Sequence, residues 1–127
     1  MSAANVELVR SIYDAWAEGR SAAAFIAEDV EYVSPPDAIE PGVLRGRRSF
    51  ARIRDAYEDV SVVPERYIAA GADDVVVIAR LKVGTRGFVT ETTQGYLWTV
   101  RDGQAVRFRW FTDPAQALEA VGLDASQ

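Results

Sequence analysis

The sequence predicts an α+β domain in which one curved antiparallel sheet is covered on its inner side by helices near the N-terminus. Apolar residues recur at helical spacing early in the chain, and later segments alternate or run apolar in the way typical of strands. Tight turns that contain Gly or Asp join those strands, as expected for an antiparallel meander. With 127 residues, the chain is expected to form a single domain, 1–127, with room for a core and a pocket.

The first helix is expected over residues 5–19. Asn5 is its expected N-cap, and Gly19 stands where a helix C-terminal glycine belongs. Tyr13 and Trp16 are expected to face the sheet as core residues, and the Tyr13 hydroxyl is also a possible hydrogen bond to a ligand. The apolar positions that define the helical spacing are Val6, Val9, Ile12, Tyr13 and Trp16.

The next segments predict short elements around a stiff loop that carries three of the five prolines. Phe50 is expected on the apolar face of the helix that follows this loop. Asp37 and Glu40 lie on the loop at the expected cavity mouth, where both a functional role and plain solvation remain open. The expected elements are a helix over 21–27, a strand over 30–34, the loop over 34–46 and a helix over 47–57.

Four strands and a last helix complete the predicted domain. The helix is expected from Pro114 to about Val121, with Asp113 as its N-cap. If Asp102-Gly103 is a two-residue turn, Leu97 lies opposite Phe108. The same register gives three further pairs, which are Gly95–Trp110, Tyr96–Arg109 and Trp98–Arg107. The strands are expected over residues 60–69, 75–83, 88–100 and 104–112.

A second turn, at Thr85-Arg86, places Arg80 opposite Glu91 and links the hairpins into two faces. A one-residue bulge would exchange part of this assignment, and long strands often carry one. Neither face is polar enough to be left wholly in water. We therefore expect one face beneath the helices and the other against a partner subunit.

Composition excludes several classes of function. A net charge of −5 argues against a general nucleic-acid binder, and no apolar run approaches the ~20 residues of a membrane helix. The N-terminus lacks a signal-peptide pattern, so we expect a cytoplasmic protein. The chain has no Cys and no His, which excludes thiol nucleophiles, Ser-His-Asp triads and zinc-finger spacing. No acidic motif suggests a metal, and no cofactor is expected.

The ordered motifs resemble the SnoaL-like branch of the nuclear transport factor 2-like superfamily. They are NVELVRSIYDAWAEG, VEYVSPP, RGRRSF and YLWTVRDGQAVRFRWF followed by TDPAQALEAVGL, and together they span nearly the whole chain. The resemblance implies a cone-shaped α+β fold whose sheet wraps an apolar pocket, and a homodimer that pairs through the outer sheet face. It implies no single activity, because the superfamily includes cyclases, isomerases, epoxide hydrolases, dehydratases and non-catalytic binders.

The catalytic patterns of these relatives transfer poorly to this chain. The cyclase pattern has an Asp on the last strand, at the place of Trp110. The epoxide-hydrolase pattern has an Arg between two carboxylates, which only Arg80 and Glu91 partly match. The isomerase pattern needs a Tyr, a protonated acid and an Asp before a proline, and these places fall on Ile12, Gly95 and Ser34.

The sequence therefore favours a small-molecule-binding protein of the SnoaL-like type for a compact hydrophobic ligand. It leaves open whether the protein is a cofactor-free isomerase, cyclase or hydrolase, or a non-catalytic homodimeric binding protein with a filled cone. The candidate catalytic residues are Arg80, Glu91 and Asp37. The expected pocket residues are Tyr13, Trp16, Phe50, Arg80, Glu91, Leu97, Phe108 and Trp110. The expected dimer-interface residues are Leu81, Tyr96, Trp98, Arg107, Arg109 and Phe111.

Two further clusters have competing interpretations. Arg80 and Glu91 form either a partly desolvated pair inside the cone or a solvated pair at its rim. The basic RGRRSF segment over residues 45–50 suggests a phosphate site, but surface charge is the simpler interpretation because no glycine-rich phosphate loop accompanies it.

Overall fold

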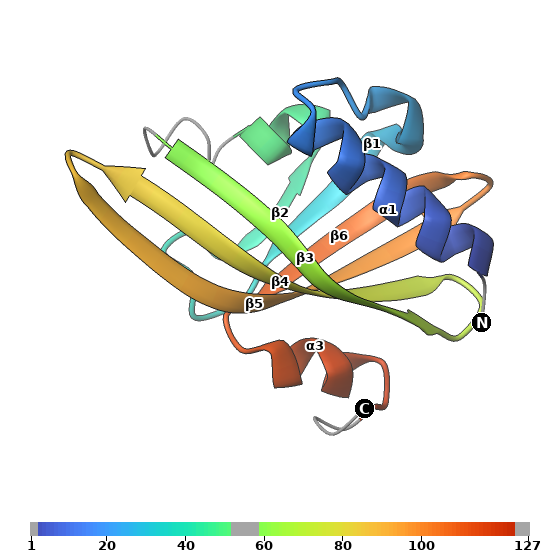
Figure 1. The fold of residues 1–127 in the computed structure, drawn as a ribbon. Coiled ribbons are helices and arrows are strands. Elements are labelled where there is room, and N and C mark those ends of the chain that lie inside the picture. The colour runs from blue at the N-terminus through green and yellow to red at the C-terminus, as the bar shows by residue number, and fades with distance from the viewer. Residues whose placement is uncertain (1–2, 52–58, 124–127) are drawn as a thin grey trace.

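A computed structural model describes residues 3–51 and 59–123 as an α+β domain with a six-stranded, curved and unclosed sheet (Figure 1). The strand order is β2-β1-β6-β5-β4-β3, and every neighbouring pair is antiparallel except β1 and β6, which run parallel. The helices are α1 (Ala3–Ala17), η1 (Ala23–Phe25), η2 (Arg47–Ala51) and α3 (Pro114–Ala120). The strands are β1 (Ile26–Ser34), β2 (Gly42–Arg45), β3 (Asp59–Ala70), β4 (Asp74–Thr85), β5 (Phe88–Arg101) and β6 (Gln104–Phe111).

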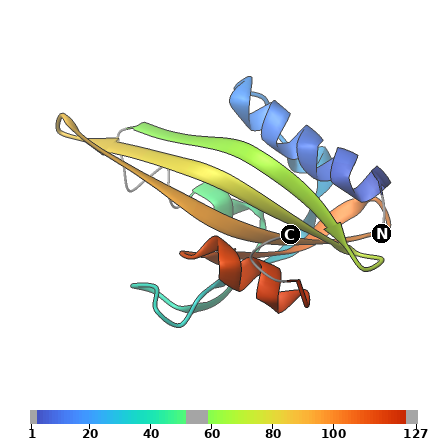
Figure 2. The ribbon, with the colours of Figure 1, turned by 60° about the horizontal axis from the view of Figure 1, so that its bottom comes forward.

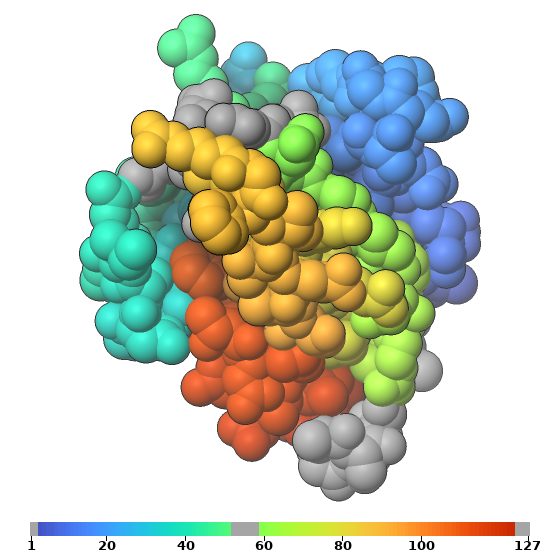
Figure 3. Space-filling model, turned by 60° about the vertical axis from the view of Figure 1, so that its left-hand side comes forward, coloured from blue at the N-terminus to red at the C-terminus, as the bar shows by residue number. Residues whose placement is uncertain are grey.

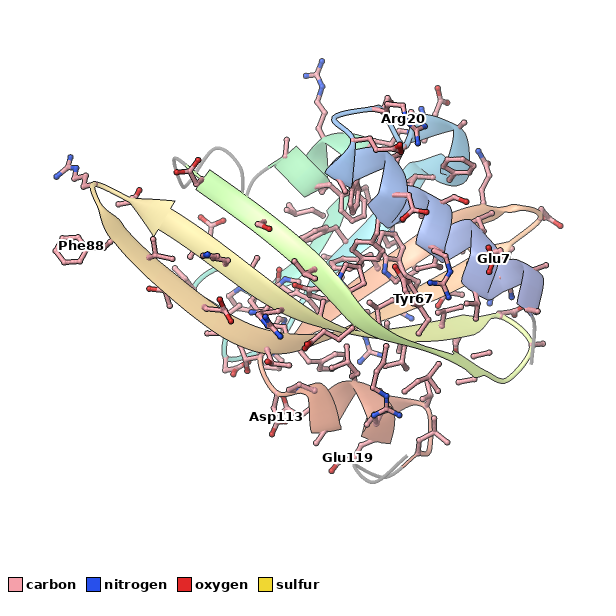
Figure 4. The ribbon with its side chains drawn as sticks, in the orientation of Figure 1. Glu7, Arg20, Tyr67, Phe88, Asp113 and Glu119 are labelled. Carbon is pink, nitrogen blue, oxygen red and sulfur yellow. The ribbon has the colours of Figure 1, made fainter. Side chains whose placement is uncertain are left out.

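The two described α-helices lie on opposite sides of the sheet (Figure 2). α1 crosses the concave side, where the Arg10 guanidinium lies 4.4 Å from the centre of the Tyr67 ring on β3 (Figure 4). α3 packs on the outer side, beside the loop over residues 35–41, and β4 and β5 form a band between β3 and α3 (Figure 3). The larger core therefore forms between α1 and the concave face, and a smaller one forms beneath α3.

The helix ends match the sequence prediction at two of three caps. Gly19 adopts φ +72° after α1, a conformation that favours glycine. Asp113 caps α3, because its carboxylate accepts a hydrogen bond from the Ala115 amide. Asn5 is not an N-cap, since α1 already includes Ala3 and the Asn5 side chain donates to the Ala72 carbonyl.

The segment between α1 and β3 differs most from the prediction. The helix expected over 21–27 is reduced to the three residues of η1, and β1 begins at Ile26. The stiff loop contains a short strand, β2, which pairs with β1 from Gly42 to Arg45. Of the helix expected over 47–57, η2 covers Arg47–Ala51 and residues 52–58 lie outside the described part of the chain.

The turn between β5 and β6 is the one predicted, but the register beyond it is not. Asp102 and Gly103 adopt φ +52° and +76°, as a two-residue hairpin turn requires. A bulge follows between Thr99 and Val100, so the strands shift by one residue. The observed pairs are Gly95–Phe111, Tyr96–Trp110, Leu97–Arg109 and Trp98–Phe108. The predicted pairing of Leu97 with Phe108 and of Gly95 with Trp110 is therefore wrong.

The predicted β4–β5 turn is also displaced. Arg86 and Gly87, rather than Thr85 and Arg86, form the turn, because Thr85 pairs with Phe88. Arg80 consequently lies opposite Thr93, and Glu91 lies opposite Lys82. The exposed Phe88 ring projects from this turn, away from the body of the protein (Figure 4).

Candidate ligand cavity

The concave side of the sheet holds a cavity of about 870 Å³. Its walls come from the C-terminal half of α1, η1, η2 and the concave faces of β1 and β3–β6. The volume is within the range of small-molecule sites in proteins, roughly 300–1,000 Å³. The side chains of the described residues therefore leave open space on the concave side.

Aromatic rings form the inner wall of this cavity. Phe50 stacks on Trp98 with ring centres 5.5 Å apart and an angle of 8° between the ring planes. Tyr32 and Phe108 close around Phe50, with centre distances of 5.3 and 5.2 Å. Such edge-to-face and stacked pairs fix the rings beyond what burial alone provides. Trp16 adds a further wall from α1, 5.5 Å from Phe50.

Tyr13 is the most deeply placed polar group in the wall. The Trp98 indole Nε1 donates to the Tyr13 hydroxyl over 3.0 Å, and Trp98 itself is fully buried. Burial raises the pKa of Tyr13 well above its usual 10.0, because the phenolate would lose its hydration. Tyr13 therefore stays protonated, and its O–H can donate to a bound molecule.

Two other hydrogen bonds orient the polar groups of the sheet wall. The Tyr96 hydroxyl donates to the Gln94 side-chain carbonyl over 3.0 Å, and burial raises the pKa of Tyr96 as well. The Trp110 indole donates to the Ser34 hydroxyl over 2.9 Å. These bonds fix the Tyr96 and Trp110 rings in the cavity wall.

The charged side chains that line the cavity are both arginines, Arg20 and Arg47, and no Asp or Glu lines it among the described residues. Arg20 lies just beyond α1 (Figure 4) and is paired with Glu18. The Arg47 Nε donates to the Ile26 carbonyl over 2.8 Å. The charge at this wall is therefore positive, although the whole chain carries −5.

Of the eight expected pocket residues, five line this cavity, and they are Tyr13, Trp16, Phe50, Phe108 and Trp110. Leu97, Arg80 and Glu91 lie on the outer face instead, because the concave face of β4 and β5 is the one that carries Leu81, Thr92 and Tyr96. Leu97 packs under α3 with Leu118. The alternation of residues along the strands could not by itself reveal which face is concave, since both faces of β4 are apolar over Val75–Ile78.

The Arg80 ion pair is a surface feature of the outer face. Arg80 lies 2.7 Å from Glu65 and 3.3 Å from Glu91, so it does stand between two carboxylates. All three side chains are exposed to solvent, with 46% for Arg80, 47% for Glu91 and 37% for Glu65. An exposed pair of this kind contributes under ~1 kcal/mol to stability. The structure thus favours the solvated interpretation of this pair.

The six expected interface residues divide between the two faces. Leu81, Tyr96 and Trp98 lie on the concave side and are buried within the protomer itself. The others, Arg107, Arg109 and Phe111, lie on the outer side. The predicted pairing of Arg109 with Tyr96 and of Arg107 with Trp98 is therefore wrong, and the Arg109 guanidinium lies 5.2 Å from the Phe111 ring centre instead.

Asp37 lies away from the main cavity. Its carboxylate accepts a hydrogen bond from the Thr112 hydroxyl over 3.2 Å, which ties the proline-rich loop to the end of β6. It borders a smaller pocket of about 180 Å³ that Trp110 separates from the main one. None of the three candidate catalytic residues, Arg80, Glu91 and Asp37, lines the main cavity.

Arg47 is the site residue that sequence reasoning assigned to the surface. It begins η2, and residues three apart in a 3₁₀ helix project on the same side, so Arg47 and Phe50 both reach the cavity. Arg48 points elsewhere and is exposed. The signal available in the sequence was the R-x-x-F spacing within RGRRSF, read with a helical period of three.

Comparisons with known proteins agree with this architecture. The SnoaL-like domain profile matches residues 9–108, which is most of the chain. The chain belongs to the SnoaL-like domain family. No curated protein sequence matches it.

Several solved structures have a fold similar to that of this SnoaL-like protein. TerC co-crystallised with polyporic acid is 23% identical with a TM-score of 0.74, over 94% of this chain and 98% of TerC. An NTF2-like protein of unknown function from Burkholderia pseudomallei K96243 is 23% identical with a TM-score of 0.73, over 96% and 99% of the two chains. A protein from Jannaschia sp. CCS1 that is described as a candidate SnoaL-like polyketide cyclase is 21% identical with a TM-score of 0.69. The match covers 93% of this chain and 91% of that chain. These similarities establish the cone-type α+β fold. In the described residues no helix is long and apolar enough to cross a membrane.

Proposed function

We propose that this SnoaL-like protein binds a compact, largely apolar, ring-containing small molecule in the concave cavity. The observation that carries the proposal is a cavity of about 870 Å³ lined by apolar and aromatic side chains together with a smaller set of polar groups, which is the usual make-up of a ligand site. TerC, a similar structure, was crystallised with the small molecule polyporic acid. The rings of Phe50, Tyr32 and Phe108 would stack on the ligand, and Tyr13 would donate a hydrogen bond to it.

A cofactor-free isomerase, cyclase or hydrolase step is the second candidate function. Its support is the Tyr13 hydroxyl, which already accepts a bond from Trp98 and can donate its proton toward a ligand oxygen that gains negative charge. The described wall supplies no carboxylate to act as a base, so this candidate ranks below simple binding. Turnover of a compact ketone or epoxide that is lost in the Tyr13→Phe variant would raise it above binding.

We also propose that the protein is a homodimer that pairs through the outer sheet face. α3 covers only part of this face, and the exposed Val89 lies beyond it on β5. Light scattering at micromolar concentration tests the proposal, and a monomer mass there would contradict it.

The binding proposal is tested with phenylnaphthylamine, an uncharged dye that fluoresces when it enters an apolar site. Thr92 and Thr93 are neighbouring exposed residues of β5, but only Thr92 lines the cavity. Thr92→Trp would fill part of the cavity and is expected to lower dye affinity at least tenfold. Thr93→Trp, the matched control, places the same ring on the outer face and should leave affinity unchanged. Equal binding by both variants would show that the dye does not use this cavity.

A further inference from the structure

The cavity wall has a charge that an apolar ligand alone does not require. Arg20 and Arg47 line it, and neither Asp nor Glu does so among the described residues. Both arginines flank the η1 turn, since Arg20 precedes it and Arg47 bonds to Ile26 directly after it. The positive charge is thus concentrated at one end of the cavity.

In the described part of the chain, Arg47 lacks the carboxylate partner that several other arginines have. Arg20 pairs with Glu18, Arg45 with Glu31, and Arg80 with two glutamates. For Arg47, no carboxylate lies within 4.0 Å in the part of the chain that the structure describes, although its side chain is half-buried. Within the described residues its hydrogen bond to Ile26 uses Nε, so the two terminal nitrogens of the guanidinium can donate to another acceptor.

The local backbone explains how this side chain reaches the wall. Gly46 adopts φ +100°, and its amide donates to the Val30 carbonyl, which turns the chain sharply after β2. η2 starts at once, and its period of about three residues places Arg47 and Phe50 on the same side. A cation and an aromatic ring are thereby presented together to the cavity.

We propose that the natural ligand carries an anionic group, of the carboxylate or sulfonate type, which the terminal nitrogens of Arg47 bind while its ring system packs on Phe50. This inference rests on the proposed binding function and adds the charge of the ligand to it. The planar guanidinium suits such a group, because two parallel N–H donors match two acceptor oxygens. An anionic ligand also supplies the counter-charge that the described wall lacks.

Two dyes of nearly the same shape test the proposal. Anilinonaphthalene sulfonate has the ring system of phenylnaphthylamine plus one sulfonate. We expect the wild-type protein to bind the sulfonate dye about tenfold more tightly, and added salt to weaken that dye alone. Binding of the uncharged dye with equal or greater affinity would overturn the inference and leave the binding function intact. If Thr92→Trp weakens the binding of neither dye, the dyes do not use the cavity. That result would refute the binding function and the inference with it.

Arg47→Gln isolates the responsible charge. It is expected to lower the affinity for the sulfonate dye fivefold to tenfold and to change the affinity for the uncharged dye less than twofold. Arg47→Lys keeps the positive charge and should retain part of the preference for the sulfonate dye. Arg48→Gln is the matched control, because it removes the same charge from the adjacent, exposed residue. If Arg47→Gln lowers the affinity for both dyes equally, the role of Arg47 is structural, through its hydrogen bond to Ile26, and the proposal is wrong. If this variant does not fold, the dye pair and salt series on the wild-type protein decide the matter.

Discussion

Gly95 is the position where a single methyl group should disturb the fold most sharply. The residue lies on the outer face of β5, directly beneath α3. A Cβ atom added there would stand 2.7 Å from the Ala117 Cβ and 2.9 Å from the Pro114 Cα. Carbon atoms in contact normally lie about 3.5–4.0 Å apart, so α3 would have to move outward by roughly 1 Å.

The expected cost follows from that displacement. α3 is short, and it covers the outer core through Ala117 and Leu118, both of which are almost fully buried. Overpacking of a tight core costs about 1–3 kcal/mol of stability. We expect a cost in the upper half of this range because one of the two close atoms belongs to the backbone of Pro114, which cannot move aside as a flexible side chain can. Gly95→Ala should therefore lower the free energy of unfolding by about 2–3 kcal/mol.

Chemical denaturation of the variant and of two companions measures this effect. Gly84→Ala is the matched control, since Gly84 is also a buried strand glycine without positive φ, but its nearest neighbour would be 3.5 Å from the new atom. We expect it to change stability by less than ~1 kcal/mol. Gly95→Ala combined with Ala117→Gly removes the closest contact and should recover part of the loss. A Gly95→Ala variant as stable as Gly84→Ala would refute the placement of α3.

The remaining predictions concern the cavity wall. Tyr13→Phe leaves the buried Trp98 N–H without its acceptor and should cost about 1–3 kcal/mol in urea denaturation, and a loss below ~0.5 kcal/mol would contradict the bond. Burial raises the pKa of Tyr13 and of Tyr96 in the folded state, so their stabilisation is complete below the unfolded pKa near 10 and is lost as pH rises above it. Stability should then fall by about 1.4 kcal/mol per pH unit for each tyrosine, whereas stability that does not fall above pH ~10 would contradict these pKa directions. Trp110→Ala should cost about 2 kcal/mol, less than the 3–5 kcal/mol of a core tryptophan, because Trp110 is only half-buried; the same denaturation assay checks this.

The fold could be predicted from the sequence because its signals are local. Helical spacing around Ile12, the glycine at Gly19 and the cap at Asp113 each fix an element through neighbours in the chain. The short strand β2 could not be predicted in this way. It exists through pairing with β1, and its four residues are all exposed, so no apolar alternation marks it.

Which residues lie on each face of the sheet could be predicted only in part, and this limited the prediction of the site residues. Alternation along a single strand is enough to group residues that share a face, for example Val76 with Ile78 and Arg80. The grouping failed across the β5–β6 hairpin, because an extra residue at the bulge leaves no mark in an apolar sequence. Which face is concave depends on the curvature of the whole sheet and on where α1 lies, and no single segment encodes either.

The bulge also accounts for the character of the cavity. Without it, Phe108 and Trp110 would share a face with Leu97 and Arg80, and the concave wall would receive Arg107 and Arg109 instead. With it, Tyr96 and Trp98 meet Trp110 and Phe108 across the same face, so β5 and β6 present Tyr96, Phe108 and Trp110 to the cavity. Among the described residues the sheet then contributes apolar and uncharged polar side chains to the wall, and the cationic groups come from the α1–η1 connection and from η2. A ligand that uses both must place its rings against the sheet and its anionic group toward Arg47, which is the orientation that the paired dyes and Arg47→Gln test.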